Sequence, residues 1–199
     1  MCPGGHVVAA ASEEGRIVTN GMSNADRDGE NANAALLVTI NPADFPYEGN
    51  LGGMQWQREI EEKAYRISGS YCAPAQLVGD FLKKVPSVGA GEITPTYRPG
   101  VHWCDLHEVL PDKITDSIAE ALPQLEGKLK GFAAPDAVMT APETRSSSPV
   151  RILRDDTRQS QLRGLYPTGE GAGYAGGIMS AAIDGIMTAE AILGVTHDR

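Results

Sequence analysis

Cysteine is scarce in this chain of 199 residues, which contains only Cys2, Cys72 and Cys104. The number is odd, the three residues are far apart, and no two of them form a CxxC pair. This pattern excludes a disulfide scaffold and is typical of reduced thiols in the cytosol. We therefore expect a cytoplasmic protein.

A surplus of basic residues is also missing. The chain has 17 Lys and Arg against 26 Asp and Glu, which gives a formal net charge of −9. Proteins that bind nucleic acids or anionic lipids do so through positively charged surfaces. The charge balance therefore predicts that nucleic acid is not a partner.

No positively charged segment followed by an apolar run opens the sequence, so no secretory signal is predicted. An apolar segment occurs at residues 178–193, but it contains Asp184 and Glu190. Such charges are costly near the middle of a membrane span. We expect no membrane association.

Motifs of metal enzymes and of serine hydrolases are absent too. His102, Cys104, Asp105 and His107 are crowded, but their spacing matches neither HExxH nor a paired-cysteine zinc pattern. No metal site is therefore predicted. The serines at 146–148 lie outside any G-x-S-x-G motif, which argues against a hydrolase.

What the sequence does contain is a mixture of helical and β-like patterns, long enough for one ordinary domain or two small ones. Helices are expected where apolar residues recur every three or four positions, and strands where short apolar runs end at turn residues. The expected strands are residues 6–10 and 16–19, paired around Gly15, and residues 34–40, 136–140, 149–153 and 164–168. The expected helices are residues 54–67, 74–82, 111–129 with a break or bend at Pro123, and 178–193.

The most informative segment is residues 164–177 (GLYPTGEGAGYAGG), which runs directly into the last expected helix. Its glycines allow positive φ angles and let a ligand approach the backbone without a Cβ in the way. Unpaired N–H groups and the dipole at the start of a helix favour a phosphate or a carbonyl oxygen. The segment predicts a nucleotide-binding corner, while a glycine-rich turn before a buried helix explains it about equally well.

Two other segments carry candidate binding residues. Gly4 and Gly5 form a glycine turn with Cys2 just before the first expected strand. Arg145 and Arg151 flank a run of serines, and guanidinium groups there are suited to hold a carboxylate substrate or a cofactor phosphate. An ordinary ion pair at a strand end accounts for these arginines equally well.

Seven segments together resemble the C-terminal portion of a family of bacterial FAD-dependent dehydrogenases, the uncharacterised NAD(FAD)-utilising dehydrogenases. They are residues 1–8 (MCPGGHVV), 12–15 (SEEG), 18–23 (VTNGMS), 27–38 (RDGENANAALLV), 73–82 (APAQLVGDFL), 143–152 (ETRSSSPVRI) and 169–186 (GEGAGYAGGIMSAAIDGI). Members of that family are longer. The resemblance implies that their N-terminal half, with the Rossmann strand, GxGxxG loop and helix for the ADP part of FAD, has no counterpart here.

The resemblance implies an α/β class and an incomplete Rossmann-like flavoprotein fold for FAD or NAD(P) binding, with an α+β cap or substrate region. Residues 1–140 would form that region, β-rich over 1–45 and mainly helical over 50–130. Residues 141–199 would be the closing segment of the FAD-binding domain.

The resemblance also implies which residues contact the cofactor. Glu170 occupies the position where related flavoproteins use a carboxylate to bind the ribityl or pyrophosphate part of FAD. The residues implied as cofactor contacts are Gly169, Glu170, Gly171, Gly173, Tyr174, Ala175, Gly176 and Gly177, together with Cys2, Gly4 and Gly5. Arg145 and Arg151 would contact the substrate or a phosphate.

The function implied by the resemblance is that of an FAD-dependent oxidoreductase, with catalytic residues that the sequence does not identify. Its partners would be FAD and a small-molecule substrate, with NAD(P)H as a candidate electron donor. The chain alone is expected to be inactive, because the ADP-binding half would lie elsewhere. Two alternatives stay open: a noncatalytic fragment that serves folding or interaction, and a nucleotide-binding module without redox chemistry.

Overall fold

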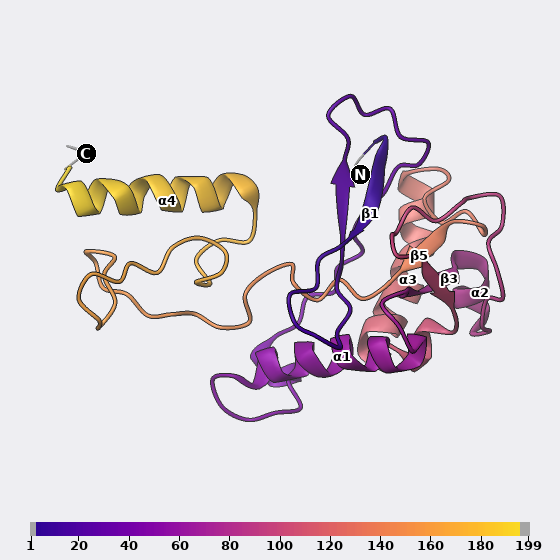
Figure 1. The fold of residues 1–199 in the computed structure, drawn as a ribbon, viewed down its shortest axis with the longest axis horizontal. Coiled ribbons are helices and arrows are strands. Elements are labelled where there is room, and N and C mark those ends of the chain that lie inside the picture. The colour runs from indigo at the N-terminus through magenta and orange to yellow at the C-terminus, as the bar shows by residue number, and fades with distance from the viewer. Residues whose placement is uncertain (1–2, 196–199) are drawn as a thin grey trace. The chain divides into compact units, whose positions relative to one another are not determined.

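Two small sheets and four α-helices, rather than one large sheet, make up the computed structural model, which describes residues 3–195 (Figure 1). The chain divides into two units. Unit 1 consists of the residues up to 41 together with 57–144, and unit 2 consists of residues 42–56 together with those from 145 onward. The boundary at 56 falls inside the first long helix.

The hairpin of unit 1 pairs β1 (Gly5–Ala9) with β2 (Thr19–Ser23), and Gly5 lies opposite Ser23. The first strand, expected at residues 6–10, is confirmed. The second was expected at residues 16–19 but begins only at Thr19, the last residue of that range. The reason is that Ile17 and Val18 are buried core residues, each 1% exposed. The N–H of Ile17 donates to the carbonyl of Glu61 on a helix, 3.1 Å away, while the carbonyl of Val18 accepts from the N–H of Ala10, just beyond β1, at 2.8 Å.

The second sheet has β3 (Ala73–Leu77) in the centre, with β4 (Val101–Trp103) parallel on one side and β5 (Val138–Thr140) antiparallel on the other. The strand at β5 is confirmed. The helix expected over 74–82 is wrong in its first half, because only α2 (Val78–Lys83) is helical. A short buried run cannot be assigned to strand or helix from periodicity alone, and here both edges of β3 find partners distant in sequence.

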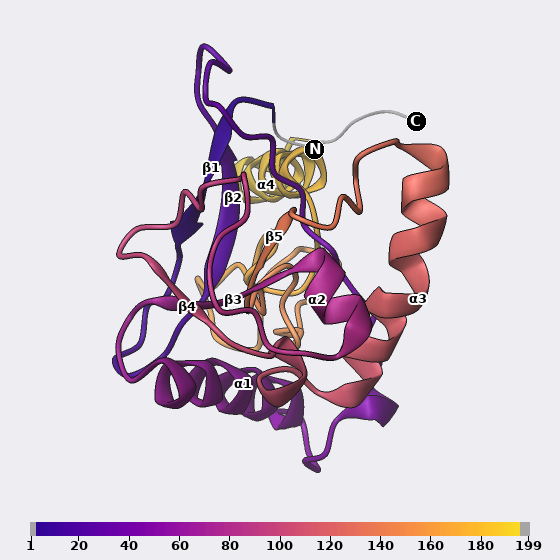
Figure 2. The same ribbon diagram turned by 90° about the vertical axis from the view of Figure 1, so that its right-hand side faces the viewer.

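The expected helices at 54–67 and 111–129 are confirmed as α1 (Gly52–Ser68) and α3 (Asp112–Lys128). Both lie beside the three-stranded sheet, with α2, in Figure 2. Pro123 lies inside α3, so the helix is not divided there. In α1, Ile60 and Ala64 are buried as an amphipathic pattern requires. Glu61 is fully buried as well, and its carboxylate accepts a hydrogen bond from the Thr144 hydroxyl at 2.6 Å. The short 3-10 helices are η1 (Pro42–Asp44) and η2 (Leu106–Glu108).

Three expected strands, at residues 34–40, 149–153 and 164–168, are not strands in the structure. These segments are extended or turn-like and find no neighbouring strand to pair with. The described part of the chain therefore has a mixed α/β architecture with one two-stranded and one three-stranded sheet. A Rossmann-like sheet stays a prediction.

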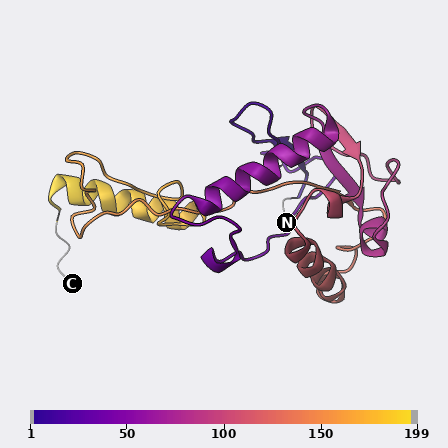
Figure 3. The same cartoon turned by 90° about the horizontal axis from the view of Figure 1, so that it is seen from below.

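Unit 2 contains α4 (Ile178–Leu193), which matches the expected helix residue for residue. The helix lies along loops formed by residues 150–177 (Figure 3). Among the described residues of unit 2, the buried apolar residues other than glycine are Pro167 and Ala172. Large apolar side chains of α4 are instead exposed, among them Ile178, Met179, Ile183, Ile186, Ile192 and Leu193. No helix in the described residues is long and apolar enough to cross a membrane.

The glycine turn before β1 generates a testable prediction about stability. Gly4 has a φ of 55°, and a Cβ on it would lie 2.0 Å from the carbonyl oxygen of Arg27. Gly15 has a similar φ of 69°, but a Cβ there meets nothing within 4 Å. We expect Gly15→Ala to cost about 1–2 kcal/mol from left-handed strain alone. Gly4→Ala should cost roughly 1–3 kcal/mol more, because it also overpacks the turn.

The measurement is urea unfolding followed by the fluorescence of Trp103, in a Trp56→Phe background so that the signal reports on unit 1. Equal losses of unfolding free energy in the two alanine variants would show that the packing of Gly4 is not a constraint.

Candidate functional site

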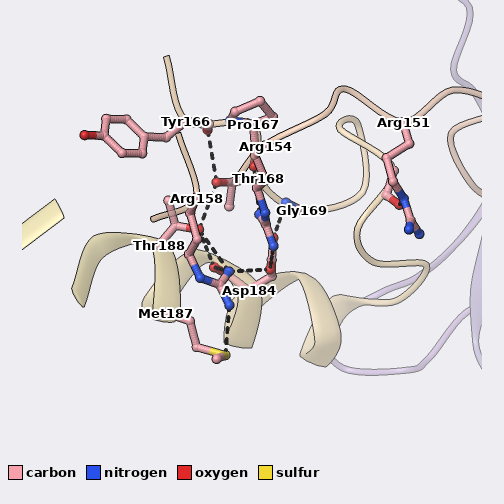
Figure 4. A network of polar contacts seen from close by, with 11 residues as sticks. Arg151, Arg154, Arg158, Tyr166, Pro167, Thr168, Gly169, Asp184, Met187 and Thr188 are labelled. Carbon is pink, nitrogen blue, oxygen red and sulfur yellow. Dashed lines mark hydrogen bonds and ion pairs between the residues drawn. The ribbon is translucent and has the colours of Figure 1, made fainter. Parts of the chain in front are cut away.

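The loops and helix of unit 2 meet at a single carboxylate, that of Asp184 on α4 (Figure 4). Arg154 binds it in a bidentate manner, with Nη2 at 2.6 Å from Oδ1 and Nη1 at 2.9 Å from Oδ2. Arg158 adds a third bond, from Nη1 to Oδ1 at 2.7 Å. The backbone N–H of Gly169 donates to Oδ2 at 2.9 Å. We refer to these four residues as the Asp184 cluster.

The Asp184 cluster is shielded from solvent, since the side chains of Arg154 and Asp184 are 9% and 12% exposed. The hydrogen bonds from Arg154 are the largest influence that holds the pKa of Asp184 well below its usual range. Burial acts in the opposite direction, and the bonds from Gly169 and Arg158 assist Arg154. Two cations therefore surround one anion that stays ionised throughout the physiological pH range.

The same cluster holds the segment of residues 169–177, which we call the glycine corner. Arg154 donates to the carbonyl of Pro167 at 2.8 Å, just before the corner, and its guanidinium lies 3.6 Å from the ring centroid of Tyr174. Within the corner, the N–H of Gly173 donates to the carbonyl of Glu170 and that of Tyr174 donates to the carbonyl of Gly169. The backbone of the corner is thus closed on itself and attached to α4.

The glycines of the corner divide into two kinds. Gly169 and Gly173 have φ angles of 74° and 81°, and a Cβ on Gly173 would lie 2.4 Å from the carbonyl oxygen of Val150. These two are required by the turn itself. Gly171 is exposed and has open space where a Cβ would be, and the nearest atom to a Cβ on Gly177 is the Ser180 hydroxyl at 3.7 Å. Only the second kind, Gly171 and Gly177, leaves the backbone open to a ligand.

Polar groups without partners gather around the open positions. Glu170 is exposed, and no described residue pairs with its carboxylate. At the start of α4, no described residue accepts a hydrogen bond from the N–H groups of Ile178, Met179 and Ser180. Gly177, before the helix, donates its N–H to the Ser180 hydroxyl at 3.2 Å. The corner therefore presents one carboxylate and the positive end of a helix to solvent.

The remaining corner residues support this backbone. Ala175 is half-buried, Gly176 is exposed, and a Cβ on Gly176 would lie 3.1 Å from the Ser147 hydroxyl. Arg151 is exposed, donates from Nε to the carbonyl of Gly173 at 3.0 Å, and lies 5.0 Å from the ring centroid of Tyr174. Arg151 thus contacts the corner through Gly173 and Tyr174. Arg145 is half-buried and also has a partner.

Gly4 and Gly5 belong to unit 1 and are buried. A Cβ on either one would lie 2.0 Å from a carbonyl oxygen, that of Arg27 for Gly4 and that of Met22 for Gly5. Close backbone packing accounts for both glycines, and their contact with a cofactor stays a prediction. Cys2 lies outside the described residues.

Of the crowded residues His102, Cys104, Asp105 and His107, the structure brings Asp105 and His107 together as a hydrogen-bonded pair. The carboxylate of Asp105 lies 2.7 Å from Nδ1 of His107, whose ring stacks on Phe81 at 4.5 Å. Burial raises the pKa of the Cys104 thiol to about 11, so the thiol keeps its proton. Over residues 3–195, no three His, Cys, Asp or Glu side chains come together in a way that would hold a metal.

The role of the Asp184 cluster was not predicted from the sequence. The available signal was an acidic residue in an apolar helix, since such a charge must be paired when it is buried. Gly171, Gly173 and Gly176 also match the letters of GxGxxG. That motif requires a preceding strand, and the residues before it here form turns, so the corner is not the ADP-binding loop of a Rossmann fold.

Comparison with known proteins places the chain in a family. A family model described as "FAD-dependent protein, C-terminal domain-like" matches residues 1–146, nearly three-quarters of the chain. The chain belongs to this family. The match supports the assignment of the chain as a C-terminal domain of FAD-dependent proteins. Its membership in the narrower dehydrogenase family stays a prediction.

A relative from Clostridium beijerinckii (strain ATCC 51743 / NCIMB 8052) bears only the description "Uncharacterized protein". It is 52% identical over 195 residues, which cover 97% of this chain and 37% of the relative. The chain thus spans little more than a third of the length of this relative. The relative's description assigns no activity to either protein.

The Asp184 cluster generates a prediction about unit 2. Asp184→Asn leaves two shielded arginines without their anion, and breaking a buried pair of this kind costs about 3–5 kcal/mol. Because the pKa of Asp184 is lowered, the stability it contributes is present above its ordinary pKa of about 4 and is lost as the pH falls through the lowered value. The wild-type chain should therefore lose more stability between pH 5 and pH 2 than the variant.

The measurement is hydrogen exchange of the α4 amides at neutral pH and over that acidic range. Asp156→Asn is the matched control, since Asp156 is an exposed acid of the same loop. Equal protection of α4 in the two variants would contradict the role of the cluster.

Proposed function

We propose that the chain is the C-terminal part of an FAD-dependent oxidoreductase, and that the glycine corner with the start of α4 contacts the flavin and the ribityl–pyrophosphate region of FAD. The observation that carries this proposal is the corner itself. It is held by the Asp184 cluster, yet it leaves Gly171, Gly177 and the first N–H groups of α4 uncovered. Membership in the FAD-dependent family supports the choice of cofactor.

The groups at the corner fit the chemistry of this cofactor. The pyrophosphate is an anion with many acceptor oxygens, and the N–H groups at the start of α4 are donors at the positive end of a helix dipole. The ribityl chain carries hydroxyl groups, which are donors for the unpaired carboxylate of Glu170. Arg151, fixed on the corner through Gly173, adds a positive charge beside it.

When bound, FAD supplies hydride or electron transfer, which no side chain of this protein provides. The role we propose for the chain's own residues is to bind and orient the cofactor. The Asp184 cluster positions the corner, the open glycines admit the ligand, and the dipole of α4 favours negative charge near its first turn. The substrate and the use of NAD(P)H as electron donor are further parts of the proposal.

A longer protein would complete this arrangement. Residues 1–140 would act as the cap or substrate region and residues 141–199 as the closing segment of the FAD-binding domain. The exposed apolar side chains of α4 support this part of the proposal, since large apolar surfaces of this kind are usually covered by a partner or another domain. The relative's greater length supports it as well. The cysteine pattern favours the cytoplasm as the location.

The proposal predicts which flavin compounds the chain recognises. Because the corner contacts the flavin, the ribityl chain and the phosphate next to it, FMN and FAD should bind with similar affinity, and ADP, which lacks the flavin and the ribityl chain, should bind more weakly than either. Glu170→Ala should weaken FMN binding about tenfold, the equivalent of one lost hydrogen bond to a charged group of about 1.4 kcal/mol.

Titration of the 199-residue chain with FMN, followed by flavin fluorescence, measures both effects. The matched control is Glu48→Ala, which removes another exposed acid of unit 2. No FMN binding, or equal affinities in the two variants, would reject the assigned role of the corner. ADP binding without flavin binding would favour a nucleotide-binding module that lacks redox chemistry.

A further inference from the structure

The ring of Tyr174 in the glycine corner contacts two arginines. The guanidinium of Arg154, which belongs to the Asp184 cluster, lies 3.6 Å from the ring centroid. The guanidinium of Arg151 lies 5.0 Å from the same centroid. Both distances are within the range of cation–π attraction, in which arginine takes part more often than lysine. The tyrosine therefore links the shielded cluster to an arginine outside it.

The two arginines differ in how their charges are balanced. The side chain of Arg154 is 9% exposed, and both of its terminal nitrogens bind the carboxylate of Asp184. Arg151 is exposed, and its side chain stands apart from the Asp184 cluster in Figure 4. No described residue accepts a hydrogen bond from its Nη1 or Nη2, and no described acid pairs with it. The charge of Arg151 is thus available to a ligand.

Arg151 is nevertheless held by contacts on two sides of its guanidinium. Its Nε donates to the carbonyl of Gly173 at 3.0 Å, and the ring of Tyr174 lies nearby. These contacts leave the edge formed by Nη1 and Nη2 free. Two parallel donors on such an edge match two oxygens of a phosphate. A side chain that is already ordered also loses less rotamer entropy when it binds an anion.

Gly173 connects this arginine to the exposed carboxylate of the corner. The N–H of Gly173 donates to the main-chain carbonyl of Glu170 at 2.9 Å, while its own carbonyl accepts from Arg151. One glycine thus joins a residue with a free carboxylate to a residue with a free guanidinium. A carboxylate suits hydroxyl groups, and a guanidinium suits an anion. A ribityl phosphate carries hydroxyl groups and a phosphate next to one another.

We propose that Arg151 binds the phosphate adjoining the ribityl chain of the flavin, and that Tyr174 is the positioning residue that orients Arg151 for this contact. The proposal rests on the function assigned to the corner above and adds a specificity to it. The site takes flavins that carry a phosphate and discriminates against riboflavin, which has the same ring and ribityl chain without one.

The test titrates the 199-residue chain with FMN and with riboflavin, followed by flavin fluorescence. The wild type should bind FMN at least about tenfold more tightly than riboflavin, because only FMN reaches Arg151. Arg151→Gln should weaken FMN binding about tenfold and leave riboflavin binding unchanged. Arg163→Gln is the matched control, since Arg163 is an exposed arginine of unit 2, and it should bind both flavins as the wild type does.

Tyr174 is tested by the ratio of the two affinities, since a general loosening of the corner would weaken both flavins alike. Tyr174→Leu should lower the preference for FMN by roughly threefold, and Tyr174→Phe, which keeps the ring, should retain it. Tyr166→Leu is the control, because the ring of Tyr166 points away from the cluster in Figure 4. In the flavin-free chain, Tyr174→Leu should also speed the exchange of the Arg151 Nε–H with solvent, and Tyr174→Phe should not.

The outcomes separate this inference from the proposed function. Equal binding of FMN and riboflavin by the wild type, or an unchanged preference in Arg151→Gln, would overturn the phosphate contact while flavin binding stands. A preference and an exchange rate that Tyr174→Leu leaves unaltered would overturn the positioning role. Binding of neither flavin would reject the proposed function and this inference with it. Amide spectra establish that the variants fold, and Arg151→Gln changes only an exposed side chain if Tyr174→Leu does not fold.

Discussion

The arrangement of unit 2 depends on one ionised carboxylate. Asp184 sits on a helix whose apolar side chains are largely exposed, and the loops beside that helix bury almost no aliphatic or aromatic residue. Hydrophobic burial therefore contributes little here, and the polar contacts of Arg154, Arg158 and Gly169 with Asp184 join helix and loops. A shielded ion pair adds little net stability over apolar packing, but it fixes geometry, because removing one partner leaves an unpaired charge.

That geometry explains how a loop rich in glycine is held in one conformation. Gly169 and Gly173 supply the left-handed backbone that the turn needs, and the cluster attaches the turn at both ends. The conformational entropy of the loop is lost when the chain folds, so a ligand would not have to supply it on binding. A cofactor site built from main-chain groups benefits from this, since its donors already point outward. We regard this preorganisation of the glycine loop as the reason that the carboxylate of Asp184 is bonded to the corner.

Helices were predicted from the sequence far better than strands. The ranges of α1, α3 and α4 follow from a local periodicity, which needs no knowledge of the remainder of the fold. A strand needs a partner, and the partners of β3 are distant in sequence, at β4 and β5. The segment at residues 34–40 has an equally apolar composition but no partner, so it is not a strand.

The candidate site was predictable in part for the same reason. The glycines, Glu170 and the start of α4 are contiguous in sequence, and their chemistry could be inferred without a structure. The pairing of Asp184 with Arg154 and Arg158 joins positions about 30 residues apart, at a distance where sequence spacing carries no geometric information. The buried Glu61 was missed likewise, because its partner Thr144 lies on another part of unit 1.

The most direct test of the account is to map the flavin contacts on the chain itself. In a ¹H–¹⁵N spectrum of the 199-residue protein titrated with FMN, we expect the largest shifts at the amides of Gly171, Gly177, Ile178 and Met179. The Arg154 Nε–H signal should stay in place, because the Asp184 cluster is formed before the ligand arrives. Shifts confined to unit 1, or a rearranged Arg154 signal with no change in the corner, would contradict a preorganised flavin contact at this position.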